Sequence, residues 1–318
     1  MNPANRIYRI GLIGARGHVG GELIRLLAGH PQLGIAFVSS REREGQAVTD
    51  FEPQAPDGLR YVNYGPGQAI EAGADAVILA LPNGHAAQWA QAFDAAGSPS
   101  LLIDLSADFR FDPEWYYGLP ELTRSGYAGQ RRISNPGCYA TAMQLAIAPM
   151  RDVLSGPVNC FGVSGYSGAG TTPSDKNNPE KLRDNLMPYA LADHLHEREV
   201  STRMATSVQF MPHVAPHFRG LSITANMILD QRFSADQVMA RYVQRFGNEP
   251  CIRIGRDIPQ TSAVAGTVLA HLGGFTLADE GRRLVVVSVL DNLLKGAASQ
   301  ALQNINLGLG LPETMGVL

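Results

Sequence analysis

A cysteine near the middle of the chain has the sequence surroundings of a nucleophile. Cys138 follows an Asn-Pro-Gly turn and begins an apolar stretch that runs to Met150 and predicts a helix. A free thiol has a pKa of about 8.5, and the N–H groups and partial positive charge of a helix N-terminus stabilise its thiolate. We therefore predict that Cys138 is a nucleophile. A small apolar core residue is the alternative, and it describes Cys160 and Cys251 better.

Two histidines and an arginine lie close together in the segment FMPHVAPHFRG, residues 210–220. A thiolate that attacks an acyl group needs a partner that moves protons, and His213, at a predicted strand end, is the candidate, with His217 as a substitute. Either histidine could instead only cap the turn. Arg219 could hold a phosphate or carboxylate of a substrate, or form a surface salt bridge.

Metal and disulfide sites find little support in the sequence. His194 and His196 alternate as residues on one face of a strand do, but no convergent set of cysteines or carboxylates accompanies them. We therefore predict no metal. The three cysteines are odd in number, widely spaced and without a CxxC pair, so we expect free thiols.

Glycines recur at a predicted strand-to-helix turn near the start of the chain. The sequence GARGHVG, residues 14–20, lies between a predicted strand, Arg9–Ile13, and a predicted helix, Glu22–Ala28. Small residues there allow a tight turn and close approach of a pyrophosphate to helix N–H groups. The spacing departs from GxGxxG and an ordinary turn is the alternative, but the context favours dinucleotide binding. The candidate cofactor-binding residues are Gly14, Arg16, Gly17, His18, Val19 and Gly20.

The end of the next predicted strand, Leu33–Ser39, indicates which dinucleotide binds. NAD-binding proteins usually place an acidic residue there for the ribose 2′-hydroxyl. This strand instead ends in Ser39, Ser40 and Arg41, which suit a 2′-phosphate. We therefore predict NADP(H) as the cofactor. A solvated surface arginine is the alternative, because acidic and basic residues follow directly.

Apolar strands and helices alternate through the first half of the chain. After the first two strands, strands are predicted at Ala76–Leu81 and Leu101–Leu105, with a helix at Ala86–Ala96 between them. This alternation implies a parallel sheet covered on both faces. The first part is therefore predicted to be a Rossmann-type, doubly wound α/β domain.

The second half has longer strand-like runs. They are Val158–Val163, Ser207–Met211, Gly220–Leu229, Thr267–Thr276 and Arg283–Leu290, with one clear helix at Ala235–Phe246. An α+β domain with a largely antiparallel sheet is predicted. The amphipathic segment Asn292–Leu309 predicts a long helix that returns to the first domain. We expect residues 1–146 and 291–318 in the NADP-binding domain, and residues 147–290 in the α+β domain.

Composition limits the classes of partner. The 318 residues include 26 Lys and Arg against 29 Asp and Glu, a formal charge of −3 without long charged runs. This balance argues against nucleic-acid and membrane partners and favours small molecules. No apolar stretch approaches the roughly 20 residues that span a bilayer, and the start, MNPANRIYRI, lacks an apolar signal core. We expect a cytoplasmic protein.

Several motifs together give the chain a family resemblance. They are GARGHVGGEL, ALPNGHA, LIDLSADFR, YGLPEL, SNPGCYAT, SGYSGAG, NLMPYALADHLH, MPHVAPHFRG and DNLLKGAASQALQNINLGLGLPET. With these motifs in this order over nearly its full length, the chain resembles the N-acetyl-γ-glutamyl-phosphate reductases of arginine biosynthesis. The resemblance implies that Cys138 is the nucleophile, His213 the acid/base residue and Arg219 an active-site arginine.

The resemblance implies further site residues. Pro82, Ser164, Gly165, Ser167, Gly168 and Asn292 are expected to bind the cofactor, and Ser106, Arg110 and Asn135 the substrate. The α+β domain is expected to be catalytic and to form a homo-oligomer, a dimer or tetramer. Two positions depart from the family pattern: Thr171-Thr172 replaces a basic residue after SGYSGAG, and His217 replaces a methionine.

The expected reaction follows from these assignments. The thiolate of Cys138 would displace inorganic phosphate from the acyl phosphate to give a thioester, which NADPH would reduce to a semialdehyde. His213 would move the protons, and backbone N–H groups at the helix start would stabilise the oxyanion. The alternatives are the same chemistry on aspartyl phosphate or a carrier-linked aminoadipyl phosphate, and a non-catalytic NADP-binding redox sensor.

Overall fold

The structure, a computed structural model, describes residues 6–318 and separates into two compact units. The first unit ends at Pro136 and resumes from Ala297 to Leu318, whereas the second comprises Gly137–Gly296. Within the described residues, no helix has both the length and the apolar composition that crossing a membrane requires.

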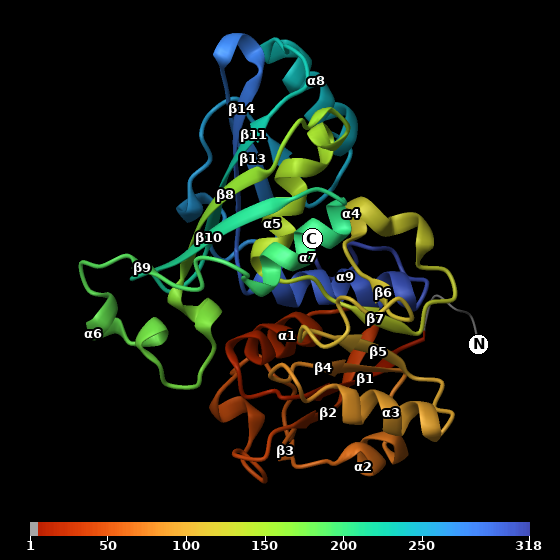
Figure 1. Ribbon diagram of the computed structural model, residues 1–318. Helices are drawn as coiled ribbons and strands as arrows, with labels where there is room; N and C mark the ends of the chain where they lie inside the picture. The colour runs from red at the N-terminus through yellow and green to blue at the C-terminus, as the bar shows by residue number, and fades with distance from the viewer. Residues whose placement is uncertain (1–5) are drawn as a thin grey trace. The chain divides into compact units, whose positions relative to one another are not determined.

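The first unit is built on a seven-stranded parallel sheet (Figure 1). In sheet order the strands are β3 (Tyr61–Val62), β2 (Leu33–Ser39), β1 (Tyr8–Ile13), β4 (Ala76–Leu79), β5 (Leu101–Asp104), β7 (Arg132–Ser134) and β6 (Tyr116–Tyr117). The helices are α1 (His18–Ala28), α2 (Pro66–Glu71), α3 (Ala87–Ala95), α4 (Pro120–Thr123) and α9 (Ser299–Gly308). Helices α1 and α9 lie on one face and α2 and α3 on the other (Figure 1). The predicted doubly wound domain is confirmed, including the return of the C-terminal helix to it.

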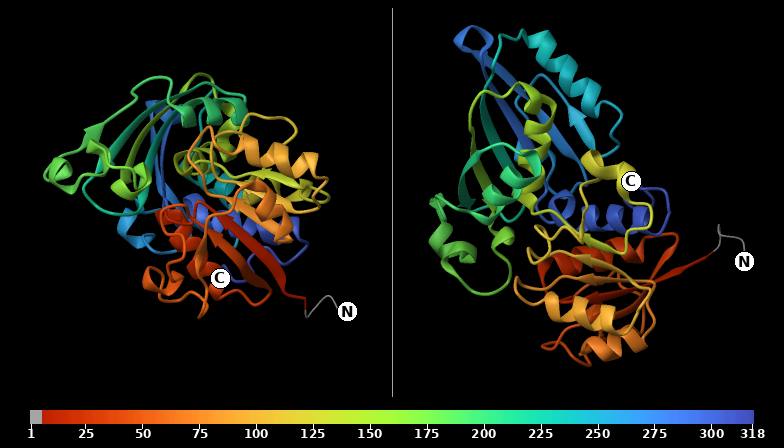
Figure 2. Two further views of the ribbon diagram at one scale, coloured as in Figure 1. Left: turned by 90° about the horizontal axis from the view of Figure 1, so that it is seen from below. Right: turned by 45° about the vertical axis from the view of Figure 1, so that its right-hand side comes forward.

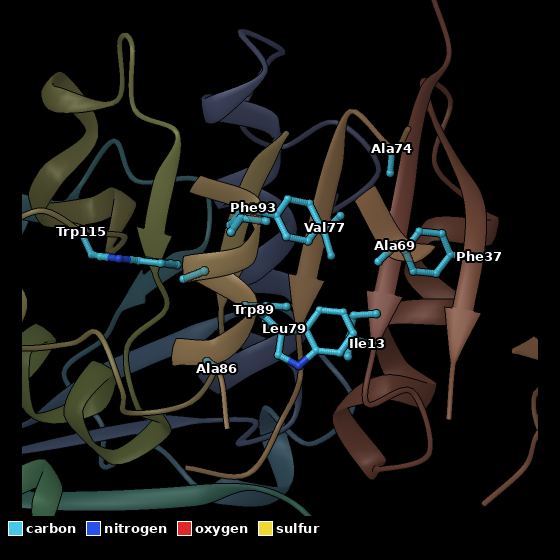
Figure 3. Packing of buried hydrophobic residues seen from close by; sticks show 12 residues of the cluster. Ile13, Phe37, Ala69, Ala74, Val77, Leu79, Ala86, Trp89, Phe93 and Trp115 are labelled. Atoms are coloured by element: carbon cyan, nitrogen blue, oxygen red, sulfur yellow. The ribbon is translucent and has the colours of Figure 1, made fainter. Parts of the chain in front are cut away.

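Large apolar side chains fill the space between this sheet and helices α2 and α3 (Figure 3). Trp89 and Phe93 of α3 are buried in one cluster with Val77 of β4. Phe37 of β2 lies over the neighbouring strand at Gly11, where an added Cβ would come within 2.3 Å of the ring. Glycine is required there because any side chain would occupy the position of the ring. This packing fixes the carboxyl ends of β1, β2 and β4. The glycine loop begins at the end of β1, and two further loops begin at the ends of β2 and β4.

The second unit has a mixed sheet of seven strands. In sheet order they are β12 (Ile252–Ile254), β13 (Ala270–Ala278), β14 (Arg283–Leu290), β11 (Leu221–Ile228), β8 (Val158–Gly165), β10 (Val208–Ala215) and β9 (Met187–Pro188). The helices are α5 (Cys138–Ile147), α6 (Pro179–Leu182), α7 (Leu195–Met204) and α8 (Ala235–Phe246). Strand pairs β8/β10 and β12/β13 run parallel, and the other pairs antiparallel. The expected α+β class is confirmed.

Among the described residues, the helices that pack on this second sheet lie on one of its faces. Helices α5, α7 and α8 pack on it, and Figure 2 (right) shows α5 and α8 on the same side. On the other side, Met211, Phe161, Thr224 and Val287 form a row across four strands. Phe161 is 40% exposed. We call this side, where no described helix packs, the open face.

The borders between the units differ from those we expected. Helix α5 was expected to end the first domain, but it packs against β11 and β14 and belongs to the second unit. A helix belongs to the domain whose strands its apolar side chains pack against, whatever its position in the sequence. At the other end, residues 291–296 also belong to the second unit.

Two local predictions need correction. His194 and His196 were read as strand residues, but His194 is the N-cap of α7, where its Nδ1 accepts the N–H of His196 at 3.1 Å. A side-chain acceptor at this position starts a helix. The single helix expected over Asn292–Leu309 is instead a π-helical turn, η9 (Leu294–Ala298), followed by α9.

Candidate functional site

The glycine loop of the first unit has the geometry of a dinucleotide cradle. Gly14 has a φ of +80°, and a Cβ added there would lie 2.2 Å from the carbonyl oxygen of Ala80. A Cβ added at Gly20 would lie 2.5 Å from the carbonyl oxygen of Ala15. At Gly17, by contrast, a Cβ would meet no described atom within 4 Å. The outer two glycines therefore close the turn, and Gly17 leaves room for a bound group.

The start of α1 is open to an anion. Its N-cap is Gly17, no side chain caps it, and its first turn holds no acidic residue. His18 and Val19 are the first two helical residues and are half-buried. The first N–H groups of a helix lack carbonyl partners within the helix. The loop and helix start therefore fit a pyrophosphate.

The residues at the end of β2 and directly after it differ in how they can serve a 2′-phosphate. Ser39 and Ser40 are buried, and the Ser39 hydroxyl accepts the N–H of Tyr64 at 3.1 Å. Arg41 is exposed, and no hydrogen bond or ion pair joins its guanidinium to a described residue. Arg16 of the glycine loop forms an ion pair with Glu42. Arg41 is thus the best placed of these side chains to meet an anion.

The expected substrate residues of the first unit converge at the ends of β5 and β7. Arg110 is buried and donates to the carbonyl oxygens of Asn135 and Leu105, both at 3.0 Å. The Ser106 hydroxyl donates to Asp104 at 2.8 Å. Burial raises the pKa of Asp104 to about 6, and the hydrogen bonds from Ser106 oppose the shift. Ser106, Arg110 and Asn135 therefore form one polar cluster.

Pro82, expected to contact the cofactor, follows β4 in the same unit and is exposed. Its role stays a prediction.

Cys138 is the first residue of α5, as the sequence predicts. The N-cap is Gly137, which has no side chain to cap the helix, and the thiol residue is half-buried. Gly296 lies against it, since a Cβ added at Gly296 would be 2.6 Å from the Cys138 Cβ. The thiol therefore sits at an uncapped helix N-terminus, the setting that favours a thiolate.

Helix α7 brings acid/base groups to this helix start. Glu199, fully buried, accepts the N–H of Gly137 at 3.0 Å through its Oε1. His196 lies three residues earlier, on the same face of α7. Its ring centroid is 6.1 Å from that of Tyr139, the residue after Cys138. This face of α7 therefore packs against the start of α5, where the nucleophile lies.

Two further side chains complete this cluster. Burial raises the pKa of Tyr189, and the nearby Cys138 adds to the shift. Burial, with a smaller contribution from Lys176, lowers the pKa of His194 to about 4. His194 is therefore neutral at pH 7 and a weak base.

The structure does not bring the ring of His213 to the side of α5. Side chains alternate along β10, and Phe210 packs on Tyr139 with ring centroids 4.9 Å apart. His213, three residues later, points to the opposite side, where its ring lies 4.4 Å from that of Phe161. Its Nδ1 lies 3.1 Å from the Met211 carbonyl oxygen. His213 therefore belongs to the open face. His217 is exposed, with its Nε2 3.1 Å from the Gly220 carbonyl oxygen.

Arg219 and the SGYSG segment are held by the end of β14. The Arg219 Nε forms an ion pair of 2.7 Å with Asp291, which is fully buried. Asn292 donates through Nδ2 to the Ser167 hydroxyl at 2.9 Å and accepts the Gly220 N–H at 2.7 Å. Both ends of its amide are thereby used inside the protein.

The loop from Ser164 to Gly168 is tied to the segment around Arg219. The Ser164 hydroxyl donates to the carbonyl oxygen of Gly165 at 3.0 Å. Gly168 lies close to the same hydroxyl, since a Cβ added at Gly168 would be 3.1 Å from its oxygen. The N–H groups of Gly165 and Ser167 donate to Gly220 and Phe218. Thr171-Thr172, after the loop, is exposed.

Sequence reasoning missed Glu199, Tyr189, Asp291 and Gly296. Glu199 could have been found once His194 was recognised as an N-cap, because His196 and Glu199 then share a helix face. Tyr189 and Gly296 give no local signal, since they approach Cys138 from distant parts of the sequence, and the ion pair of Asp291 with Arg219 also joins distant segments.

Comparison with known proteins agrees with the two-unit architecture. The NAD binding domain of semialdehyde dehydrogenases matches residues 9–130, and their dimerisation domain matches residues 138–292. Aspartate semialdehyde dehydrogenase II from Vibrio cholerae covers 96% of this chain and 99% of its own, with a TM-score of 0.77 at 19% identity. The enzyme with NADP from Candida albicans has a TM-score of 0.73 at 16% identity, covering 95% and 98%. The fold is thus that of the semialdehyde dehydrogenases, and the expected nicotinamide dinucleotide domain is confirmed.

Relatives in sequence identify the family within this class. An N-acetyl-gamma-glutamyl-phosphate reductase from Xanthomonas axonopodis pv. citri is 61% identical over 308 residues, 97% of this chain and 98% of that protein. The reductase of the same name from Stenotrophomonas maltophilia is 60% identical over 306 residues, 96% of each chain. The chain belongs to the N-acetyl-γ-glutamyl-phosphate reductase family.

Proposed function

We propose that this protein catalyses the NADPH-dependent reduction of N-acetyl-γ-glutamyl phosphate to N-acetyl-L-glutamate 5-semialdehyde and phosphate, a step of arginine biosynthesis. The observation that carries the proposal is Cys138 at the uncapped start of α5, in a chain about 60% identical to reductases of that name. The aspartyl alternative is less well supported, because the aspartate semialdehyde dehydrogenases share only the fold, at 16–20% identity, whereas relatives at about 60% identity carry the acetylglutamyl name.

The cofactor is held by the first unit. The uncapped start of α1 and the space at Gly17 fit a pyrophosphate, and Arg41 provides a charge for a 2′-phosphate. When bound, NADPH supplies the hydride that reduces the thioester.

The second unit provides the nucleophile. The Cys138 thiolate attacks the acyl carbon, and the C–S bond forms as the bond from that carbon to the phosphate oxygen breaks. Backbone N–H groups in the first turn of α5 stabilise the oxyanion, because the first N–H groups of a helix have no carbonyl partners within the helix. After reduction, cleavage of the C–S bond releases the semialdehyde and restores the thiolate.

His196 is the proton carrier in this scheme, in place of the expected His213. It lies on the face of α7 that reaches the Cys138 helix start, whereas the His213 ring lies on the open face. His196 takes the thiol proton, returns it to the oxyanion formed on reduction, and takes it again as the hemithioacetal collapses. Arg219 binds an anionic group of the substrate.

A homo-oligomer is part of the proposal. The match to a dimerisation domain over residues 138–292 supports it, and the open face, with the exposed Phe161, is the surface we assign to contact between copies. The choice between dimer and tetramer, the cytoplasmic location and the absence of a metal or nucleic-acid partner stay predictions.

The reverse reaction tests the function. Purified protein is mixed with NADP, phosphate and N-acetylglutamate semialdehyde, and NADPH formation is followed by absorbance, with aspartate semialdehyde run in parallel. Phosphate-dependent turnover of the acetylated substrate is expected, with loss in Cys138→Ser and retention in Cys251→Ala, a buried cysteine with no assigned role. Turnover of only the aspartate compound would overturn the substrate, and NADP binding without turnover of either would favour the redox sensor.

A further inference from the structure

We infer that Asp291 is a positioning residue that fixes the guanidinium of Arg219 for the substrate, an inference that rests on the proposed function. Asp291 follows β14 and is fully buried. Burying an ionised carboxylate is costly unless partners compensate its charge and fill its lone pairs.

Backbone groups hold this carboxylate independently of Arg219. Its Oδ1 accepts the N–H groups of Leu293 and Leu294 at 2.8 and 3.0 Å. Its Oδ2 accepts the N–H of Gly266 at 2.6 Å. Three main-chain donors from two segments therefore set the place and plane of the carboxylate.

Arg219 is oriented by that fixed group. Its Nε forms an ion pair with Oδ2 at 2.7 Å, and its Nη2 donates a hydrogen bond to Oδ1 at 3.3 Å, so the guanidinium is held beside the Asp291 carboxylate. The arginine side chain is 23% exposed, whereas that of Asp291 is 0% exposed. The ion pair therefore lies on the buried side of the guanidinium. A long side chain otherwise loses rotamer entropy on being fixed, and this restraint removes part of that loss from substrate binding.

The next residue holds the neighbouring backbone. Asn292 accepts the N–H of Gly220, which follows Arg219 directly, and donates to Ser167 in the loop after β8. Two consecutive residues after β14 therefore hold Arg219 by its side chain and by its peptide. Such double restraint is suited to binding a rigid anionic group at a defined distance from the reacting carbon.

Replacement of Asp291 should therefore affect substrate binding more than chemistry. In Asp291→Asn an NH2 group replaces one carboxylate oxygen, and this group can neither accept a backbone N–H nor attract Arg219. We expect the KM for the semialdehyde to rise at least about tenfold, with kcat changed less than threefold. Asp279→Asn is the matched control, because it breaks an exposed Asp–Arg pair, with Arg283, at the other end of the same strand; its KM should stay at the wild-type value.

The combination with Arg219 distinguishes positioning from a general structural role. If Asp291 acts through Arg219, the KM of Asp291→Asn combined with Arg219→Ala equals that of Arg219→Ala alone. The inference is wrong if the two substitutions raise KM by factors that multiply in the double variant, or if Asp291→Asn leaves KM unchanged. The proposed function stands in either case as long as the wild type turns over the substrate. If Asp291→Asn does not fold, Asp291→Glu carries the test, since it keeps the charge and shifts the carboxylate by one methylene.

A binding measurement separates the inference from the proposed function. Calorimetry with N-acetyl-L-glutamate needs no turnover, and the same tenfold weakening is expected in Asp291→Asn. Weakened binding without wild-type turnover would support positioning and overturn the reaction, whereas equal binding by wild type and variant would overturn positioning.

Discussion

At the scale of single residues, the identity of the proton carrier can be tested by two substitutions. His196 shares a helix face with Glu199, which reaches the residue before Cys138, whereas His213 packs on Phe161. We predict that His196→Asn lowers kcat by about 10²-fold or more, the usual contribution of general acid–base catalysis. His213→Asn should keep kcat within about threefold. Steady-state rates and the pH profile of kcat/KM measure both.

The opposite ranking of the two variants would restore His213 as the acid/base residue. Equal, small effects would indicate that the thiol needs no histidine. Oligomeric mass is recorded for each variant, because His213 lies on the open face and its replacement could act through assembly.

Cofactor choice is also decided by single side chains. Arg41 is exposed after β2, whereas Arg43 lies over the Phe51 ring, 3.8 Å from its centroid. We predict that Arg41→Ala weakens NADP binding by about tenfold and leaves NAD binding unchanged, because only the 2′-phosphate contact is lost. Fluorescence titration with both cofactors measures this, with Arg60→Ala, an exposed arginine near β3, as control. A parallel loss for both cofactors would contradict a 2′-phosphate contact.

At the scale of elements, His30 links the turn after α1 to the C-terminal segment. Its Nδ1 accepts the N–H groups of Gln32 and Leu33, and its Nε2 lies 3.1 Å from the Asn306 Oδ1 on α9. Burial lowers the pKa of His30 below 6.5, and the hydrogen bond that His30 donates to Asn306 opposes the shift. Both backbone bonds require Nδ1 without a proton.

This arrangement predicts a pH dependence of stability. Because the folded state holds the neutral form, the stabilisation is complete above the unfolded pKa of 6.5 and is lost as the pH falls through the lowered pKa. His30→Asn keeps an acceptor but cannot titrate, so its free energy of unfolding should fall less than that of wild type between pH 7.5 and 5. At pH 7.5 the free energy of unfolding of His30→Asn should be about 1 kcal/mol lower than that of wild type, because the hydrogen bond to Asn306 is lost. Denaturant unfolding at both pH values measures this, and an identical pH dependence would exclude His30 as the titrating group.

How much the sequence predicts also differs between elements. The glycine loop, the helix start at Cys138 and most strands rest on local patterns, and the structure has them where they were expected. The alternation of β10 is equally visible, but which side faces α5 depends on pairing with β8, so the sequence alone does not show that the His213 ring lies on the open face. The approach of Gly296 to Cys138 joins residues far apart in the chain, so no local pattern announces it.

At the scale of the whole molecule, the open face should decide assembly. Phe161 is 40% exposed in a row with Met211, Thr224 and Val287, and the matching dimerisation domain spans this sheet. A glutamate within an apolar contact between copies would be buried without a partner, at a cost of several kcal/mol. We predict that wild type is at least a dimer at micromolar concentration and that Phe161→Glu is a folded monomer.

Val243→Glu is the matched control, because Val243 is 51% exposed on α8, on the side of the sheet that helices cover. Light scattering coupled to size exclusion gives the mass of each form, and circular dichroism verifies folding. The control should keep the wild-type mass, since it adds the same charge away from the open face. A dimer that survives Phe161→Glu but is lost in Val243→Glu would move the interface to the helical side, and a monomeric wild type would remove the assembly altogether.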